Sequence, residues 1–145
     1  MSEQNKQLVR RYFEELDRGK AAPVHLCTAD FAFHVAGFPS MDVEATKRFA
    51  AMFYSALPDL THPIDELIAE GDKVAFRGRY EGTHTGDFMG VPPSGQRISV
   101  VGVGVFRVAN GRVAEFWVSP DRMSLMQQIG ALAVQEQASS VQHQR

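Results

Sequence analysis

The chain has 145 residues, 44% hydrophobic and 22% charged, which is the size and composition of one globular domain. Fifteen Lys and Arg against seventeen Asp and Glu give a formal net charge of −2, and the lack of a basic run argues against nucleic-acid binding. The single cysteine excludes a disulfide framework and a Cys-x-x-Cys metal site. No segment has the apolar length of a signal peptide or a membrane span, so we expect a cytoplasmic protein that binds no membrane.

Helices and one strand are expected in the first part of the chain. Residues 5–17 form a helix with an apolar stripe at helical spacing, Leu8, Val9, Tyr12, Phe13 and Leu16. A short helix over 23–28 and a strand over 30–35 follow, and the turn 37–39 ends the strand. Residues 42–57 form a second amphipathic helix whose stripe is Thr46, Phe49, Ala50, Phe53, Tyr54 and Leu57.

From residue 61 onward the hydrophobic period changes to two, which predicts strands. Strands are expected over 61–69, 73–85, 98–108 and 112–119, with hairpin turns at 70–72 and 109–111. The Gly- and Pro-rich residues 86–95 form a loop, and residues 121–129 form a closing helix. Because consecutive strands joined by tight turns pair antiparallel, we expect an antiparallel sheet.

This order of elements predicts an α+β fold in which a strongly bent sheet packs on the first helices. A bent sheet closed by helices forms a cone-shaped barrel with an internal cavity, where small molecules bind in many proteins. One domain is expected over residues 1–134, with a disordered tail over 135–145. Valines on both faces of the strand 98–108 need cover on the outer side, which favours a homodimer or higher oligomer.

Several segments are similar to one known family. The run EGTHTGDFMGVPPSG at 81–95 closely resembles the G-T-H-x-G-x-(F/L)-x-G-x-P-P-(T/S)-G loop of SnoaL-like polyketide cyclases. Residues 106–117 resemble that family's strand–turn–strand, and residues 120–130 its closing helix. Residues 31–34 and 57–60 also fit, so the likeness runs from about residue 6 to residue 132.

The resemblance implies the nuclear transport factor two-like fold, a cone of bent sheet and helices. It also implies cofactor-free, intramolecular aldol closure of a polyketide ring, on a hydrophobic carbonyl compound. The aspartate that matches Asp121 is the acid/base of that reaction. Phe116 departs from the pattern, since many relatives have His or Glu there, which puts one polar pocket contact in doubt.

Asp121 is the first catalytic candidate. A carboxyl group in an apolar cavity can remove a proton from carbon and return it to an alkoxide. The sequence also fits a plain helix start, with Ser119 as the N-cap, Pro120 at the first position and Asp121 stabilised by the helix dipole. Both interpretations remain open from the sequence.

His84 and His34 are the other catalytic candidates. His84 shares a strand face with Phe76 and Tyr80, so it either points into the cone to polarise a carbonyl or bonds the backbone of the following loop. His34 lies on the opposite strand face from Phe33, and one of these faces meets the cavity. No metal-ligand spacing joins these residues, so neither a metal nor another cofactor is expected.

The expected pocket wall is aromatic and apolar, which suits a flat polycyclic substrate; its candidates are Tyr12, Met52, Phe53, Tyr54, Phe106 and Trp117. Cys27 is expected to be a buried packing residue. Two other functions remain open. An epoxide hydrolase of the same fold would show a pocket arginine between two acids. A non-catalytic binding or dimerisation module would show a filled cone or an exposed Asp121.

Overall fold

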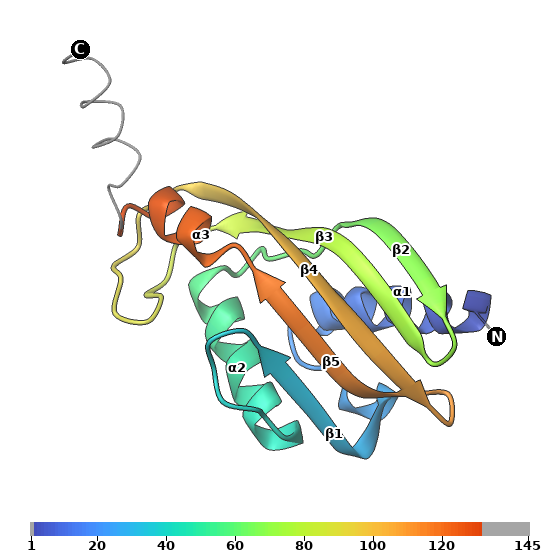
Figure 1. The fold of residues 1–145 in the computed structure, drawn as a ribbon. Coiled ribbons are helices and arrows are strands. Elements are labelled where there is room, and N and C mark those ends of the chain that lie inside the picture. Colours follow the sequence, from blue (N-terminus) through green and yellow to red (C-terminus); the bar gives the residue numbers. More distant parts are fainter. Residues whose placement is uncertain (1, 132–145) are drawn as a thin grey trace.

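The computed structural model describes residues 2–131. Its elements in chain order are α1 (Ser2–Gly19), the 3-10 turn η1 (Val24–Leu26), β1 (Cys27–Val35), α2 (Val43–Ala56), β2 (Ile64–Glu70), β3 (Lys73–Thr83), β4 (Arg97–Ala109), β5 (Arg112–Pro120) and α3 (Arg122–Gln128) (Figure 1). The expected α+β fold class is confirmed. The expected domain end at 134 and the tail 135–145 lie outside the described residues.

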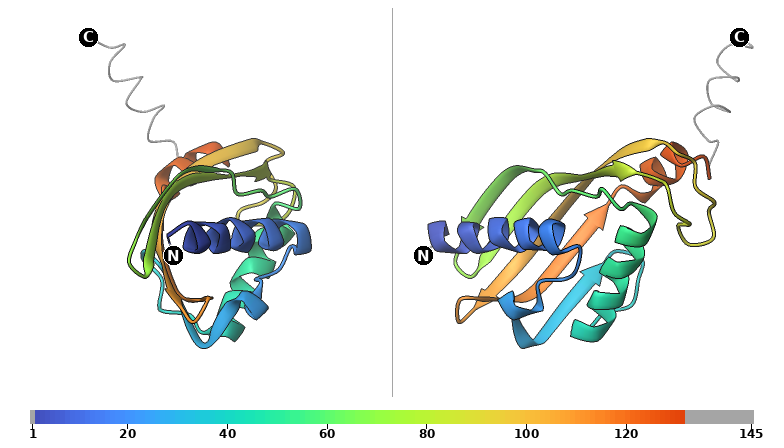
Figure 2. Two further views of the ribbon diagram at one scale, coloured as in Figure 1. Left: turned by 90° about the vertical axis from the view of Figure 1, so that its right-hand side faces the viewer. Right: turned by 180° about the vertical axis from the view of Figure 1, so that it is seen from behind.

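The two long helices form where the apolar stripes predicted them. Helix α1 buries Val9, Tyr12, Phe13 and Leu16, which lie three or four residues apart on one face. Helix α2 begins at the N-cap Asp42, whose carboxylate accepts the amide N–H of Ala45 at 2.9 Å. The sheet curves around α1, which lies on its concave side (Figure 2). The stripe of this helix packs on the sheet, since Tyr12 and Phe13 contact Phe106 of β4.

The sheet has five strands in the order β1-β5-β4-β3-β2 and is not closed into a barrel. The pairs β2–β3, β3–β4 and β4–β5 are antiparallel, as the hairpin turns required. The pair β1–β5 is parallel, so the expectation of a wholly antiparallel sheet was wrong for this edge. No tight turn joins these two strands, because most of the chain lies between them, and their relative direction is therefore free.

Glycines on β3 and β4 let the sheet bend and leave space on its concave face. Gly78 and Gly102 are paired across the two strands, and both line the cavity described below. At Gly104, a Cβ atom would lie 2.2 Å from the carbonyl oxygen of Trp117 and 2.7 Å from the ring of Phe76. Any side chain there would displace the neighbouring strand or the aromatic wall.

None of the helices within residues 2–131 is long and apolar enough to cross a membrane.

Candidate functional site

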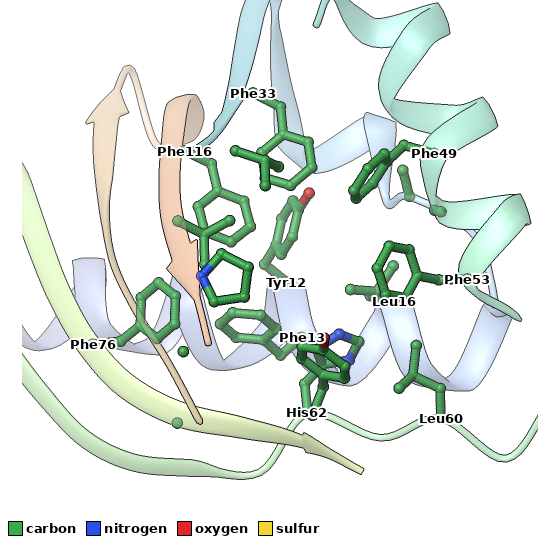
Figure 3. A pocket seen from close by; sticks show the side chains of 18 of the residues that line it. Tyr12, Phe13, Leu16, Phe33, Phe49, Phe53, Leu60, His62, Phe76 and Phe116 are labelled. Atoms are coloured by element: carbon green, nitrogen blue, oxygen red, sulfur yellow. The ribbon is translucent and has the colours of Figure 1, made fainter. Parts of the chain in front are cut away.

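A cavity of about 130 Å³ lies between α1, α2 and the concave face of the sheet (Figure 3). Its wall is largely apolar and is rich in aromatic side chains: Tyr12, Phe13, Phe33, Phe49, Phe53, Tyr54, Phe76, Tyr80 and Phe116. The rings contact one another in a continuous series, with 4.8 Å between the centroids of Phe33 and Phe116 and 5.7 Å between those of Phe33 and Phe49. An apolar cavity of roughly 150 Å³ holds a benzene molecule, so this cavity accepts a single ring as it stands.

Tyr12 supplies a polar atom in the middle of this wall. Its hydroxyl oxygen points between Phe33 and Phe49 in Figure 3. Burial raises the pKa of the phenol above its ordinary value, and the charge of Cys27 adds to this effect. The hydroxyl therefore stays protonated at neutral pH and can donate a hydrogen bond to a ligand oxygen.

The second polar feature of the cavity is a pair formed by Asp17 and His62. Asp17, in the last turn of α1, accepts the backbone N–H of His62 at 2.8 Å and lies 2.6 Å from the Nδ1 of its imidazole. The hydroxyl of Tyr54 also donates to this carboxylate, at 2.8 Å. The imidazole stacks on Phe13, with 5.6 Å between centroids, and lines the cavity beside that ring (Figure 3).

Sequence reasoning missed both members of this pair. Asp17 and His62 are 45 residues apart, and no motif connects them. Asp17 fits a helix end and His62 fits a strand start, so each has an ordinary structural explanation alone. Only the return of the chain from α2 past the end of α1 brings them together.

Asp121 is exposed and caps α3, since its carboxylate accepts the amide N–H of Ser124 at 3.0 Å. Pro120, the preceding residue, lines the cavity. The charge of Asp121 acts on Tyr80, which is another lining residue. Burial first, and then the charge of Asp121, raise the pKa of the Tyr80 phenol. Asp121 therefore lies at the rim of the cavity rather than within its wall.

His84 does not line the cavity. It follows the last residue of β3 and is fully buried, with its Nδ1 accepting the amide N–H of Ser94 at 3.1 Å. Its backbone bonds Gly95 and Gln96, so the residue fastens the two ends of the loop between β3 and β4. Of the two interpretations the sequence left open for His84, this geometry matches the bond to the loop.

His34 and Trp117 lie on the outer face of the sheet. His34 points away from the cavity because Phe33 and Val35, its neighbours on β1, line it. Its Nε2 lies 3.0 Å from Oε2 of Glu115, and its ring stacks on Trp117 with 5.3 Å between centroids.

Three of the six expected wall residues line the cavity, namely Tyr12, Phe53 and Tyr54. Phe106 is fully buried behind the wall, where it stacks on Phe116 with 4.1 Å between centroids, and Met52 packs against the core. Cys27 is buried, and burial raises the pKa of its thiol to about 12, in line with a packing role. Within residues 2–131 no three His, Cys, Asp or Glu side chains gather as a metal site would require.

An arginine between two acids does occur at the border of the cavity, although neither acid lines it. Arg79 lies between Asp65 and Glu81, with its Nη1 2.7 Å from Glu81 and its Nε 3.1 Å from Asp65. Side chains alternate along a strand, so Arg79 points to the opposite face of β3 from Phe76 and Tyr80. Although Arg79 borders the cavity, this alternation turns its guanidinium outward. The arrangement expected of an epoxide hydrolase is therefore not formed inside the cavity.

The sequence model of the SnoaL-like polyketide cyclase family matches residues 6–129. A comparison with curated proteins finds no match. Among solved structures, a candidate SnoaL-like polyketide cyclase from Jannaschia sp. CCS1 is 29% identical and has a TM-score of 0.80, covering 90% of this chain and 94% of that one.

Two Streptomyces proteins are similar over nearly their whole length. AclR from Streptomyces galilaeus, a candidate hydroxylase, is 26% identical with a TM-score of 0.83, over 91% of this chain and 88% of that one. IdmH from Streptomyces antibioticus, a candidate polyketide cyclase, is 26% identical with a TM-score of 0.77, over 88% of this chain and 99% of that one. These matches confirm the family resemblance found in the sequence. The chain belongs to the SnoaL-like polyketide cyclase family.

Proposed function

We propose that the protein catalyses a cofactor-free, cyclase-type reaction of a hydrophobic carbonyl compound by acid/base chemistry, of the intramolecular aldol kind. The observation that carries this proposal is the apolar cavity, rich in aromatic side chains, with a few polar groups in its wall and at its rim. Apolar walls hold the carbon skeleton, while hydroxyl, imidazole and carboxyl groups handle its protons and oxygens. The family supports a cyclase-type role, and the relatives' descriptions include both cyclases and a hydroxylase.

An aldol closure needs a base that removes a proton from the carbon beside a carbonyl. Asp121 is the residue that the family resemblance implies for this step, and its place at the cavity rim supports the proposal. Its carboxylate caps a helix in the free protein. Catalytic hydrogen bonds often form only in the substrate complex, and in this proposal the side chain leaves the cap and turns toward the bound ligand.

The test is a reaction with heptane-2,6-dione, a diketone that an intramolecular aldol reaction closes to a single six-membered ring. Nuclear magnetic resonance in D₂O follows both exchange of the protons beside the carbonyls and formation of the hydroxyketone. We expect both rates to exceed the buffer rate. Ala50→Leu fills the cavity and should abolish the excess, whereas Ala51→Leu adds the same side chain at an exposed position of α2 and should not.

A binding module is the second candidate, because an exposed Asp121 was its expected sign. In that case the wild-type protein would bind a one-ring ketone, Ala50→Leu would prevent binding, and neither exchange nor ring closure would exceed the buffer rate. Such a result would leave the cavity as a ligand site and rule out the cyclase.

A further inference from the structure

His62 has one ring nitrogen held by the protein and one that has no partner among residues 2–131. Its Nδ1 lies 2.6 Å from the carboxylate of Asp17. Carboxylate oxygens only accept hydrogen bonds, so Nδ1 carries the proton of this contact. The remaining polar atom of the ring is Nε2, and His62 is one of the residues that line the cavity.

We propose that His62, positioned by Asp17, is a second proton-transfer residue of this site and supplies the proton that the ring-closing step requires. This inference rests on the proposed function. In addition to Asp121, the base at the rim, it assigns a proton donor to the cavity wall. The family resemblance assigned neither residue a role.

Two contacts of the imidazole, and two more that hold its backbone and its partner Asp17, restrain the ring in one orientation. The carboxylate of Asp17 holds both the backbone N–H and the Nδ1 of His62, at 2.8 and 2.6 Å. The ring of Phe13 supports one face of the imidazole, with an angle of 26° between the two planes. The Tyr54 hydroxyl in turn holds Asp17, at 2.8 Å. A side chain restrained in this way loses little freedom when it meets a substrate.

Few charged groups surround the imidazole. Asp17 on α1 contacts it directly and balances the charge of a protonated ring. Tyr54 on α2 is linked to the imidazole through Asp17, the carboxylate that both residues contact. Tyr80 on β3 is the other titratable neighbour, with 6.5 Å between its ring centroid and that of His62. Burial, as the main cause, raises the pKa of both phenols, so they remain neutral near physiological pH.

The reaction balances with the residues present. The Asp121 carboxylate takes a proton from the carbon beside one carbonyl, and the C–H electron pair becomes the double bond of an enolate, whose oxygen accepts a hydrogen bond from Tyr12. The enolate carbon then bonds to the second carbonyl carbon. The electrons of that carbonyl move to its oxygen, which takes the Nε2 proton of the doubly protonated His62 ring and leaves a neutral ring with its proton on Nδ1. Transfer of the proton from Asp121 to His62 through water restores both residues, and the net change is an isomerisation.

The size of the cavity narrows the class of substrate. At about 130 Å³ it is close to the space one benzene ring occupies. The substrate portion that reacts near His62 is therefore a carbonyl chain that closes to one ring, with any further rings lying toward the rim.

The test compares His62→Gln and Asp17→Asn with His34→Gln, which breaks the similar pair on the outer face. With heptane-2,6-dione, we expect kcat of His62→Gln to fall by about 10²–10³-fold with KM changed less than about 3-fold. Asp17→Asn should lower kcat by about 10²-fold, because the imidazole loses its orientation, and His34→Gln should match the wild type.

Two further measurements keep the inference testable if a variant folds poorly or turnover is low. Added imidazole should restore part of the activity of His62→Ala, an effect that a structural role would not give. Phenol resembles an enol and fits the cavity, so the wild-type protein should bind it about 3- to 10-fold better than toluene, and His62→Leu should lose this preference.

The outcomes separate the inference from the proposed function. Wild-type turnover in His62→Gln would overturn the inference and leave the cyclase standing. A phenol preference that depends on His62, without turnover in the wild type, would overturn the cyclase and with it the proton transfer. Absence of both turnover and preference would overturn both.

Discussion

Among the histidine–carboxylate pairs of residues 2–131, one lies at the cavity and one on the outer face of the sheet. His62 and Asp17 are 2.6 Å apart, and His34 and Glu115 are 3.0 Å apart. The side chains of the first pair are each 21% exposed, and those of the second 30% and 24%. By contact distance and burial alone the two pairs are nearly equivalent.

They differ in what surrounds them. Glu115 also accepts the Nε–H of Arg107 at 2.9 Å, so the outer pair belongs to a charged network on the sheet surface. Asp17 instead receives a phenol and a backbone N–H, and its histidine borders an apolar cavity. The comparison teaches that a hydrogen-bonded histidine and carboxylate are not by themselves a catalytic unit. The apolar cavity beside His62 is the feature that lets a substrate bind next to this imidazole.

The largest effect is expected at Asp121. In the proposed reaction this residue is the base that acts together with His62, and the outer pair has no such residue beside it. Asp121→Asn should lower turnover of heptane-2,6-dione by about 10²–10⁴-fold, because Asn cannot carry the proton. Its melting temperature should change little, since Asn caps a helix about as well as Asp. Steady-state kinetics and thermal unfolding measure the two effects.

Asp121→Ala is the matched control, because it removes the cap as well as the acid. It should lose the same activity and also about 1 kcal/mol of stability. If Asp121→Asn kept the wild-type rate, Asp121 would be a helix cap only, and the cavity pair would have to act without it.

Much of the fold could be predicted because it depends on local pattern. The helical stripes placed α1 and α2, and the change to a period of two placed the strands within a few residues of their ends. The parallel pairing of β1 with β5 could not be predicted, since it depends on contacts between distant segments. The strand expected to reach residue 85 ends at Thr83, so His84 belongs to the following loop rather than to the strand.

The site was harder to predict for the same reason. Tyr12, Phe53 and Tyr54 were found because they belong to helical stripes that must face the sheet. Alternation along β1 shows that His34 and Phe33 point to opposite faces, yet it does not say which face is inside. The pairing of His62 with Asp17 has no local signal at all, so only the folded chain reveals it.

The next effect concerns the outer face, where we propose that the protein forms a homodimer. Val101 and Val103 on β4 are 50% and 48% exposed. They lie on the outer face of the sheet, the face that also carries His34 and Glu115. A charge buried there should cost several kcal/mol, so Val103→Lys should weaken the dimer by about 10²-fold or more. Sedimentation should show a wild-type mass about twice the 16.1 kDa of the chain.

Val24→Lys is the control for this prediction, because Val24 is exposed on η1 and away from the sheet face. It should sediment as the wild type does. A wild-type protein that sediments as a monomer would leave both histidine pairs in single chains and end the dimer proposal.

A smaller effect separates the two pairs by stability. Asp17→Ala leaves the Tyr54 hydroxyl and two donors of His62 without their acceptor, which should cost about 2–3 kcal/mol. Glu115→Ala removes a partly exposed pair on the sheet surface, and should cost about 0.5–1 kcal/mol. Urea unfolding measures both. Equal losses of stability in the two variants would mean that burial, rather than the number of hydrogen-bond donors, determines how much each pair stabilises the fold.

The smallest effect is the pH dependence of the outer pair. The hydrogen bond from His34 first, and then that from Arg107, lower the pKa of Glu115 below its ordinary 4.5. Near that pH the unfolded chain therefore binds more protons than the folded one, so stability falls as the pH falls. The contribution of Glu115 is fully present above about pH 5 and is lost as the pH drops through the lowered folded value.

Glu115→Gln removes this contribution, so the difference in unfolding free energy between the variant and the wild type should be about 0.5 kcal/mol at neutral pH and vanish in acid. His34→Gln should remove part of the same difference, since the imidazole gives the larger of the two effects on the carboxyl group. Urea unfolding between pH 3 and pH 7 measures it. A constant difference across this range would show that the carboxylate keeps no charged partner in solution, and the outer pair would no longer serve as the inactive counterpart of His62 and Asp17.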